Sequence, residues 1–358
     1  MSIVADHYQF VIGVDTHAAT HTYAVIESPS GRHLDSATFP TTPAGLARAE
    51  AWIGRRTGGN VGGTLIAAEG TGSYGAVMTE RLAQAGYRVT EAPAPPRSRS
   101  DGKTDTLDAR AAAASTLVMA MGKLRDRRAG QVASALHVLT TAREQMNAER
   151  LRAINALTAL LRAWDLGIDA RKALSEAQIA RVAAWRRYRA EPLPQATART
   201  EVIRHAKRVT TLNTDLAANR AQIHTLVTQQ APELLDMPGL GPITAAVILA
   251  VWSHPGRIRS EAALAKISGT CPIPASSGNT TRHRLNRGGN RQLNRALHTI
   301  ALTRMRADQT TRQYVDRRID EGKTRKEIRR SLKRYISRQI YRTLINLEHT
   351  TQHDPKPA

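Results

Sequence analysis

The stretch VIGVDTHAATHTYAVI, residues 11–26, carries two short apolar runs with an aspartate between them. The first run, residues 10–14, ends directly at Asp15, and the second covers residues 22–26. Short runs of branched and aromatic residues bounded by polar ones are typical of buried strands. A Pro-Ser-Gly triplet at residues 29–31 then predicts a hairpin turn. The chain is therefore expected to open with strands, the first ending at an acidic residue.

Helices and strands alternate in the sequence that follows. Apolar residues recur at helical spacing over residues 43–53 and 73–85, which predicts two helices. Between them, residues 65–68 form a buried-strand candidate that ends at Glu69, and residues 88–91 form another short strand. Such alternation predicts an α/β domain.

The middle of the chain has a purely helical pattern. Residues 131–164 are predicted to form one long helix, with an apolar stripe at Leu139, Ala142, Met146, Ala153, Leu157, Leu160 and Trp164. Two prolines in residues 191–195 interrupt the helix. A second helical segment then has a heptad pattern, at Val209, Leu212, Leu216, Asn219, Ile223 and Leu226. This pattern predicts a helical hairpin or coiled coil over residues 130–230.

The C-terminal part is also expected to be helical. The segment LLDMPGLGPITAAVILA, residues 234–250, contains two helical runs around a Pro-Gly-Leu-Gly turn, which predicts a helix-hairpin-helix-like turn whose helix N-terminus can hold a phosphate. Further helices are expected at 261–267, 290–306 and 326–347. The predicted organisation is an α/β domain at 1–129, a helical coiled-coil linker at 130–230, a helical domain at 231–347 and a disordered tail at 348–358.

The charge of the chain is high and unevenly distributed. The formal net charge of the 358 residues is +22. Residues 1–96 hold six Lys and Arg against eight Asp and Glu, a net of −2, whereas residues 281–345 hold nineteen against five, a net of +14. Such a local excess indicates a polyanionic partner. The last part of the chain is therefore expected to bind nucleic acid.

Cysteine content and hydropathy exclude other classes. Cys271 is the single cysteine, so the chain cannot form an internal disulfide, and a cysteine-based zinc site is disfavoured. The mixed, polar residues 1–10 do not resemble a signal peptide. The best apolar run, residues 243–252, is too short to span a bilayer. We therefore expect a cytoplasmic protein that does not use its charge to bind a membrane.

Four acidic residues occupy positions suited to metal chemistry. Asp15 and Glu69 end apolar strands, and Asp105 and Asp108 lie three residues apart at the start of a predicted helix, so they share one face. Two-metal phosphoryl transfer needs several carboxylate oxygens around Mg²⁺ or Mn²⁺. Helix capping and the helix dipole are an alternative explanation for the helical pair. An acid at the end of a buried strand carries a desolvation cost that a metal would offset.

Three segments resemble one known family. The segments VIGVDTHAATHTYAVI (11–26), IAAEGTGSYG (66–75) and KTDTLDARAAA (103–113) are similar, in this order, to the DEDD transposases of the insertion-sequence-110 family, which are bridge-RNA-guided recombinases. This resemblance implies a RuvC-like, ribonuclease H-like N-terminal domain. It also implies that Asp15, Glu69, Asp105 and Asp108 are catalytic metal ligands.

A second resemblance concerns the segment ALAKISGTCPIPASSGNTTRHRLNRGGN, residues 263–290. It is similar to the C-terminal transposase domain of the same family, in which a Ser-Gly pair follows a proline-rich loop. The resemblance implies that Ser277 is the nucleophile, with the adjacent Ser276 as the alternative. A serine hydroxyl needs a group that takes its proton and screens the phosphate, and the metal ions could do both. From the residues alone, Ser-Ser-Gly-Asn is also an ordinary turn.

Basic residues follow the serine segment at helical spacing, opposite an apolar face. This pattern favours contacts with a phosphate backbone, although a solvated amphipathic helix would have a similar pattern. The residues expected to bind nucleic acid are Arg282, Arg284, Arg287, Arg291, Arg295, Lys326, Arg330, Lys333 and Arg334.

The resemblance also implies partners: donor and target DNA, a structured guide RNA, and further copies of the chain in a dimer or tetramer. The predicted function is a transposase that cuts and rejoins DNA. Two alternatives stay open at this point, a RuvC-like structure-selective nuclease that uses water as the nucleophile and a nucleic-acid-binding protein without catalytic activity. A tyrosine recombinase would leave the four acids unexplained.

Overall fold

The computed structural model describes residues 2–93, 104–186, 191–275 and 283–353. It divides the chain into two compact units, Met1–Ala129 and Gly130–Ala358. Among the described residues, none of the helices combines the length and the apolar character needed to cross a bilayer.

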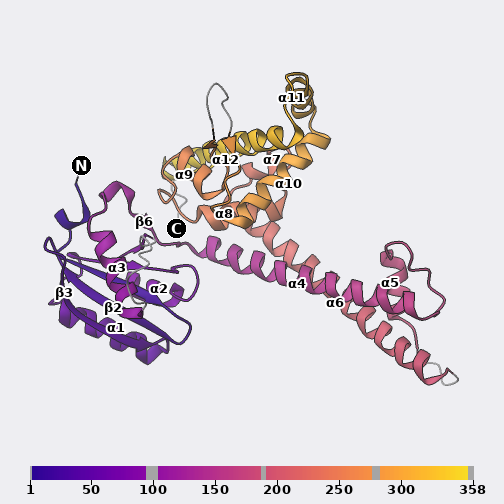
Figure 1. Cartoon of the computed structure of the whole chain (residues 1–358), viewed down its shortest axis with the longest axis horizontal. Coiled ribbons are helices and arrows are strands. Elements are labelled where there is room, and N and C mark those ends of the chain that lie inside the picture. Colours follow the sequence, from indigo (N-terminus) through magenta and orange to yellow (C-terminus); the bar gives the residue numbers. More distant parts are fainter. Residues whose placement is uncertain (1, 94–103, 187–190, 276–282, 354–358) are drawn as a thin grey trace. The chain divides into compact units, whose positions relative to one another are not determined.

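The first unit is built on a mixed six-stranded sheet (Figure 1). Its strands lie in the order β3-β2-β1-β4-β5-β6, and β1 pairs antiparallel with β2 but parallel with β4, which in turn is parallel to β5. The α/β class predicted for this unit is confirmed. The strands are β1 (Phe10–Thr16), β2 (Thr20–Glu27), β3 (Arg32–Pro40), β4 (Thr64–Ala68), β5 (Arg88–Glu91) and β6 (Arg125–Asp126).

Helices cover both faces of this sheet. One face buries Ile12, Val14 and Ile66 against α1 (Pro43–Arg56) and α2 (Ala76–Gln84). The opposite face carries a separate core, with Val11, Leu65 and Ala67 against Ala113 and Leu117 of α3 (Asp105–Leu117). Two short 3₁₀ turns, Val4–Asp6 and Met121–Lys123, complete the unit. The sheet therefore presents alternate strand residues to two different cores.

Gly13 allows α3 to lie directly on β1. A Cβ atom at this position would be 1.9 Å from the carbonyl oxygen of Ala109 and 2.6 Å from the amide nitrogen of Ala113. Only glycine has no side chain to prevent this approach. The α3 helix is therefore fixed against the middle of β1, one turn from its own N-terminus.

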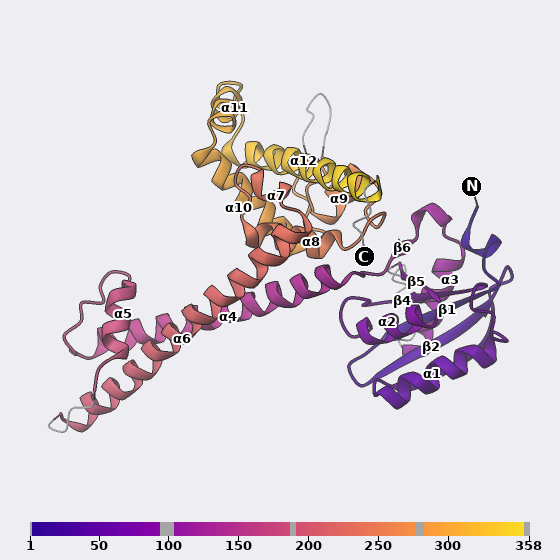
Figure 2. The ribbon, with the colours of Figure 1, turned by 180° about the vertical axis from the view of Figure 1, so that it is seen from behind.

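Two long helices, α4 (Gln131–Ala163) and α6 (Leu193–Gln230), pack side by side in the second unit, and a short helix, α5 (Glu176–Ala183), packs on α6 (Figures 1 and 2). The stripe buried on α6 includes five of the six predicted heptad positions: Val209, Leu212, Leu216, Asn219 and Ile223. Val227 follows them in the core, where Leu226 was expected, and Leu226 is only partly buried.

The polar residue predicted within this stripe makes hydrogen bonds to the neighbouring helix. Asn219 donates from Nδ2 to the carbonyl oxygen of Leu139 at 3.0 Å, and Arg143 donates to the carbonyl oxygen of Leu216 at 2.9 Å. A buried amide without a hydrogen-bond partner destabilises the folded state. These contacts therefore favour one register of α4 against α6.

The stripe predicted on α4 is partly wrong. Ala142 is exposed, and Leu136, Thr140 and Leu161 are buried, whereas the predicted Leu139 and Leu160 are only partly buried against the core. The reason is that α4 is apolar at several neighbouring positions near both of its ends. Two overlapping stripes therefore fit the sequence, and the packing against α6 and α8 selects one of them.

The remaining helices of the second unit enclose a common core (Figure 1). They are α7 (Glu233–Asp236), α8 (Pro242–Trp252), α9 (Glu261–Ile267), α10 (Arg291–Ala307), α11 (Gln309–Asp320) and α12 (Arg325–His353). A two-stranded sheet joins them, formed by β7 (Ile273–Pro274) and β8 (His283–Arg284). The disordered tail predicted at 348–358 is wrong for residues 348–353, because the last helix continues to His353. Glu348 accepts a hydrogen bond from Nε1 of Trp252 at 2.7 Å, which holds this part of the helix to the core.

Candidate functional site

The alternation of side chains along two strands directs two acids to the α3 face of the sheet. Val11 of β1 and Leu65 of β4 both lie in the core beneath α3. Successive residues of a strand point to opposite faces, so Asp15, four residues after Val11, and Glu69, four after Leu65, point to this same face. Val14 pairs with Ala68 in the parallel register, which brings the two acids to the same edge of the sheet.

The first turn of α3 contributes the other two acids. Asp105 precedes Ala109 by four residues, so it lies one turn from the point where α3 touches Gly13 of β1. The N-cap of α3 is Thr104, whose side chain accepts a hydrogen bond from the amide of Leu107. Since Thr104 already caps the helix, capping does not account for Asp105 and Asp108, although the helix dipole favours both.

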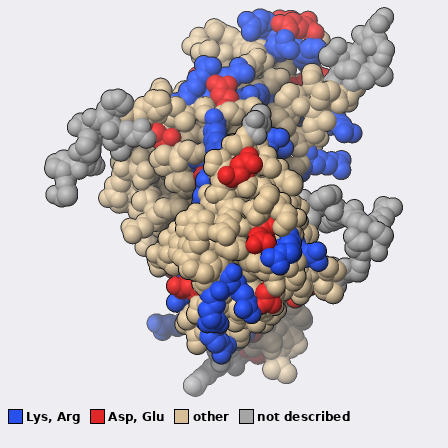
Figure 3. Space-filling model, turned by 90° about the vertical axis from the view of Figure 1, so that its left-hand side faces the viewer, with Lys and Arg blue, Asp and Glu red and all other residues tan. Residues whose placement is uncertain are grey.

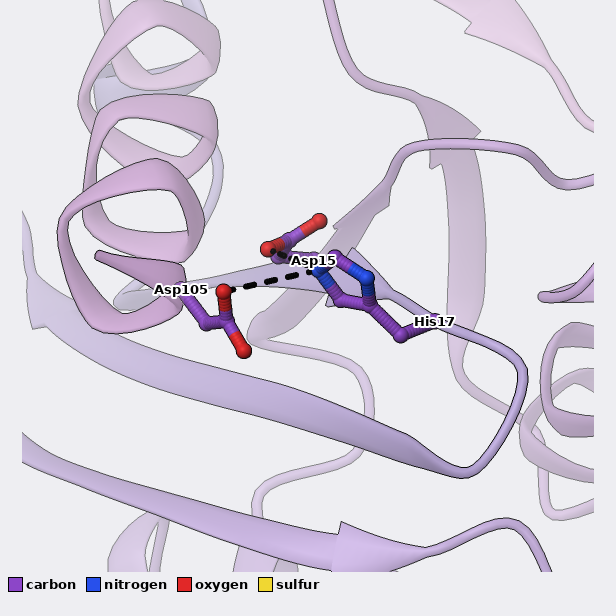
Figure 4. A group of neighbouring side chains, drawn as sticks. All are labelled: Asp15, His17 and Asp105. Carbon is purple, nitrogen blue, oxygen red and sulfur yellow. Dashed lines mark hydrogen bonds and ion pairs between the residues drawn. The ribbon is translucent and has the colours of Figure 1, made fainter. Parts of the chain in front are cut away.

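A histidine joins the aspartates of β1 and α3 (Figure 4). Nε2 of His17 lies 3.0 Å from Oδ2 of Asp15 and 3.5 Å from Oδ1 of Asp105. One ligand atom from each of these three residues lies within 4.8 Å of the others. Asp15 is 8% exposed, whereas the side chains of His17 and Asp105 are about half exposed. The group is therefore open to solvent on the side of His17 and Asp105.

Glu69 is coupled electrostatically to two other acids of the site. Burial raises the pKa of the Glu69 carboxyl, and the negative charges of Asp15 and Asp108 raise it further. Its backbone is fixed, because its amide donates to the carbonyl oxygen of Val14 and its carbonyl oxygen accepts from the hydroxyl of Thr16, both at 3.1 Å. A raised carboxyl pKa beside like charges is the expected result when several acids share one site.

The residues present fit a hard divalent cation. Asp15 and Asp105 supply carboxylate oxygens within one group. Glu69 lies near enough to Asp15 and Asp108 for their negative charges to raise the pKa of its carboxyl. Carboxylate oxygens are the preferred ligands of Mg²⁺ and Mn²⁺, and imidazole nitrogen is an acceptable ligand for Mn²⁺. A bound cation would remove the repulsion that raises the pKa of Glu69.

His17 was not identified from the sequence. It lies outside the apolar runs, and its imidazole meets Asp105 only because α3 folds back over β1. The available signal was its position two residues after Asp15, which places it near the end of the same strand.

The predicted serine region lies partly outside the described residues, which include neither Ser276 nor Ser277 nor Arg282. Its flanking segments are described, and β7 and β8 pair antiparallel, with Pro274 opposite His283. Arg330 of α12 donates a hydrogen bond to the carbonyl oxygen of His283 at 3.4 Å. The two ends of the connecting segment, residues 275 and 283, are therefore close together.

Most of the predicted nucleic-acid-binding residues that are described lie on the surface. Arg295 forms an ion pair with Glu144 at 2.6 Å, so part of the charge is already neutralised within the chain. On the face drawn in Figure 3, Lys and Arg side chains form separate groups among Asp and Glu. The exposed residues of the predicted set are Arg284, Arg287, Arg291, Arg295, Lys326 and Arg330.

Lys333 departs from the expected exposed face. It is only 9% exposed, and its ammonium group donates to Oδ1 of Asn294 at 2.6 Å. Burial lowers the pKa of Lys333, and the nearby charge of Arg329 lowers it further. Lys333 is buried because of helical geometry. It precedes the buried Ser337 by four residues and therefore lies on the core side of α12. Arg334 is half-buried, with its Nη1 atom inside the protein.

Comparison with known proteins identifies the class. Residues 12–164 match a family model for DEDD transposases of IS110 elements, and residues 231–316 match the model described as "Transposase IS116/IS110/IS902 family". The chain is 31% identical to the 42 kDa protein of insertion element IS900 from Mycobacterium paratuberculosis, over 87% of this chain and 89% of that protein.

Two Streptomyces proteins are also similar. The 43.6 kDa protein of insertion element IS110 from Streptomyces coelicolor is 38% identical over 33% of this chain and 30% of its own length. The 44.8 kDa protein of insertion element IS116 from Streptomyces clavuligerus is 27% identical over 63% of this chain and 66% of its own length.

The α/β unit with its acidic site and the helical unit that follows thus define a DNA transposase. More particularly, the chain belongs to the IS116/IS110/IS902 family of insertion-sequence transposases, and its N-terminal unit is a RuvC-like DEDD domain.

Proposed function

We propose that this transposase cuts and rejoins DNA through a covalent serine intermediate, with divalent cations held by Asp15, Glu69, Asp105 and Asp108. The observation that carries the proposal is the convergence of these acids at one edge of the sheet, with Asp15, His17 and Asp105 in direct contact and Glu69 under the repulsion of its neighbours. Mg²⁺ or Mn²⁺ bound there would screen the charge of the DNA phosphate and favour ionisation of the attacking hydroxyl.

The residues of the chain have distinct parts in this mechanism. Asp15 and Glu69 are fixed by neighbouring strands, so they set the position of the site, while α3 brings Asp105 and Asp108 to it. His17 bridges Asp15 and Asp105 and holds both carboxylates in place. A site built on a sheet and a packed helix is rigid, as phosphoryl transfer requires.

Ser277 is proposed as the nucleophile, on the strength of its place in the segment that resembles the family. Its hydroxyl oxygen would form a bond to phosphorus, lose its proton, and displace one bridging oxygen of the DNA strand, which takes up a proton as a free hydroxyl. The phosphoserine bond retains the free energy of the broken linkage. Attack by a hydroxyl of another strand then restores the DNA and releases the serine.

We further propose that the exposed arginines near the start of α10, together with Lys326 and Arg330 of α12, bind donor and target DNA, and that a structured guide RNA selects the DNA sites. The local net charge of +14 over residues 281–345 supports a polyanionic partner. The proposed segments are a catalytic domain at 1–129, a coiled-coil linker at 130–230, and a serine-bearing domain at 231–347 with a helix-hairpin-helix-like turn.

A covalent-trapping experiment tests the nucleophile. Purified protein is incubated with labelled DNA carrying the element ends, its guide RNA and Mg²⁺, and protein–DNA adducts are separated under denaturing conditions. The wild type should give adducts and Ser277→Ala none, while both bind DNA equally. Adducts formed in normal yield by Ser277→Ala, but not by Ser276→Ala, would assign the role to Ser276. Hydrolysed ends without adduct would indicate a nuclease that uses water.

Mixing two inactive variants tests whether subunits cooperate. The proposed acids belong to the first unit and the proposed serine to the second. We propose an oligomer in which one chain supplies the acids and another the serine. A mixture of Asp15→Asn and Ser277→Ala should then recover part of the activity that each lacks alone. The absence of any recovery in co-assembled oligomers would mean that each chain completes its own site.

A further inference from the structure

A pocket in the second unit has a buried arginine in its wall. Its volume is about 530 Å³, and it lies where the turn before α8, the junction of α10 with α11, and α12 come together. The lining residues that matter here are Pro238, Arg304, Asp308, Thr310 and Arg342.

Arg304 is held rigidly, but its hydrogen-bonding capacity is incompletely used. The side chain is only 8% exposed, its Nε donates to the carbonyl oxygen of Pro238 at 2.6 Å, and its Nη1 donates to Oε1 of Gln339 at 2.7 Å. Its Nη2 atom is buried and has no hydrogen-bond acceptor within the part of the chain that the structure describes. The Nη2 atom itself is not open to the pocket, but the guanidinium is a buried positive charge that forms no ion pair among the described residues, and such a charge favours an anion in the adjoining pocket.

The start of α11 adds donors to the same pocket. Asp308 is the N-cap of this helix and accepts the amide of Thr311 at 2.8 Å. Thr310 follows at the second helical position and is exposed. The N-terminus of a helix carries a partial positive charge and unpaired amide groups, which attract anions. The carboxylate of Asp308 already accepts the amide of Thr311, and Thr310 lines the pocket.

Arg342 makes the pocket positive overall. It shares the carboxylate of Glu261 with Arg338, at 2.9 Å and 2.8 Å respectively, so these three side chains retain one positive charge. Together, Arg304 and Arg342 outweigh the single carboxylate of Asp308 in the pocket wall. Arginine is the side chain best suited to hold phosphate oxygens by paired hydrogen bonds.

We propose that this pocket binds one backbone phosphate of a nucleic acid, with the guanidinium group of Arg342 and the N-terminus of α11 as its ligands and the buried positive charge of Arg304 beside them. The pocket has room for the phosphate and its adjoining sugar. The inference rests on the proposed binding of nucleic acid by the second unit. The same phosphate chemistry is present in RNA and DNA, so the experiment uses both.

Two matched pairs of variants test the pocket in the full-length chain. Thr310→Asp and Gln309→Asp place the same charge at the same helix end, where acids favour the helix, but only Thr310 lines the pocket. Arg342→Gln and Arg338→Gln each remove one arginine from Glu261, but only Arg342 lines the pocket. Thermal unfolding should be similar within each pair.

The probes are a fluorescent single-stranded RNA, a single-stranded DNA and a duplex DNA of one sequence, and their dissociation constants are measured by anisotropy over a range of salt. For the nucleic acid that occupies the pocket, Thr310→Asp and Arg342→Gln should each weaken binding by about fivefold or more and reduce the salt dependence by about one phosphate contact. Gln309→Asp and Arg338→Gln should change binding by less than about twofold.

Equal effects within each pair, or no effect on any probe, would overturn the proposal while leaving the proposed function intact. If the wild type bound none of the three probes, the pocket and the proposed binding of nucleic acid by this unit would both be wrong. An effect on the RNA alone would identify the RNA as the ligand, and an effect on DNA alone would identify the DNA.

Discussion

The acidic site of the first unit and the basic surface of the second are built in opposite ways. The acidic site gathers Asp15, Glu69 and Asp105 from distant parts of the sequence, and two of them meet across one imidazole. The basic residues are instead spread along consecutive helices, and some of them form ion pairs with acids of their own unit. Chemistry at the first unit should therefore depend on each residue, whereas binding at the second should be divided among many.

The largest effect expected from this comparison is the loss of catalysis at Asp15. Asp15→Asn should reduce DNA strand cleavage by about 10³-fold, because a neutral amide is a poor substitute for a buried ligand of a divalent cation. DNA binding should change by less than about twofold. Single-turnover cleavage measures the first quantity and a gel-shift titration the second.

Asp35→Asn is the matched control for that variant. Asp35 also belongs to the first unit but forms an ion pair with Arg56 away from the acidic site. Its cleavage rate should remain close to that of the wild type. Similar losses in both variants would mean that the acidic site has no special role in the reaction.

The next effect concerns the contact that brings α3 to the sheet. Gly13→Ala should destabilise the first unit by about 2 kcal/mol or more, because the added Cβ would overlap the carbonyl oxygen of Ala109. Activity should fall as well, since Asp105 and Asp108 move with α3. Chemical denaturation, followed by a probe in the first unit, measures the change.

Gly54→Ala provides the comparison for that substitution. Gly54 lies within α1, and a Cβ there would meet nothing within 4 Å. The exchange should stabilise the protein by about 0.5–1 kcal/mol through the better helix propensity of alanine. If Gly13→Ala did not destabilise the protein, or changed its free energy of unfolding as little as Gly54→Ala does, the close packing of α3 on β1 would be contradicted.

Substitution of Glu69 should have a smaller effect, a change in thermal stability that depends on pH. The pKa of Glu69 is raised in the folded protein, so its contribution to stability is present at low pH and is lost as the pH rises through the folded pKa. Without divalent cations, Glu69→Gln should therefore raise the melting temperature near neutral pH and have little effect at about pH 4. Thermal scans over a pH series check this sign.

Divalent cations should reverse the order of the melting temperatures of the wild type and Glu69→Gln, so that the wild type becomes the more stable protein. Added Mn²⁺ should raise the melting temperature of the wild type more than that of Glu69→Gln, and more at neutral pH than at acidic pH. Glu80→Gln, which removes an acid paired with Arg127, serves as the control. An identical response to Mn²⁺ in the wild type and in Glu69→Gln would remove Glu69 from the metal site.

The smallest effect should come from one exposed residue of the basic helices. Lys326→Gln should weaken DNA binding only severalfold and reduce the salt dependence by about one phosphate contact, because many residues share the binding. Lys172→Gln removes the same charge from the segment between α4 and α5 and should have no such effect. A loss of binding by orders of magnitude in Lys326→Gln would show that the basic surface also depends on single residues.

The sequence predicted the acids of the site more successfully than their surroundings. Asp15 and Glu69 follow apolar runs, and strand alternation alone places them on one face. His17 was missed because its contact with Asp105 depends on the packing of α3, which no local pattern encodes. The hairpin turn before the edge strand β3 was predicted, but the strand itself was not delimited, because its half-exposed residues mix polar and apolar types without a buried run.

The helices of the second unit show where local patterns were insufficient. α11 was not predicted, because its twelve residues bury only Thr311 and Val315 and therefore give little apolar signal. Lys333 was expected to contact nucleic acid because it lies in a basic sequence, but its place on α12 turns it toward Asn294. Charge composition predicted that the second unit is basic, and tertiary packing determines which of its charged side chains are exposed.

Direct measurement of metal binding tests the central claim that the acids of the first unit hold divalent cations. Free Mn²⁺ is measured by electron paramagnetic resonance as it is titrated into the wild type, into the double variant Asp15→Asn/Asp105→Asn, and into Asp35→Asn. The wild type and Asp35→Asn should bind Mn²⁺ with the same affinity, and the double variant should bind it at least about tenfold more weakly. Equal affinity in all three proteins would contradict the claim.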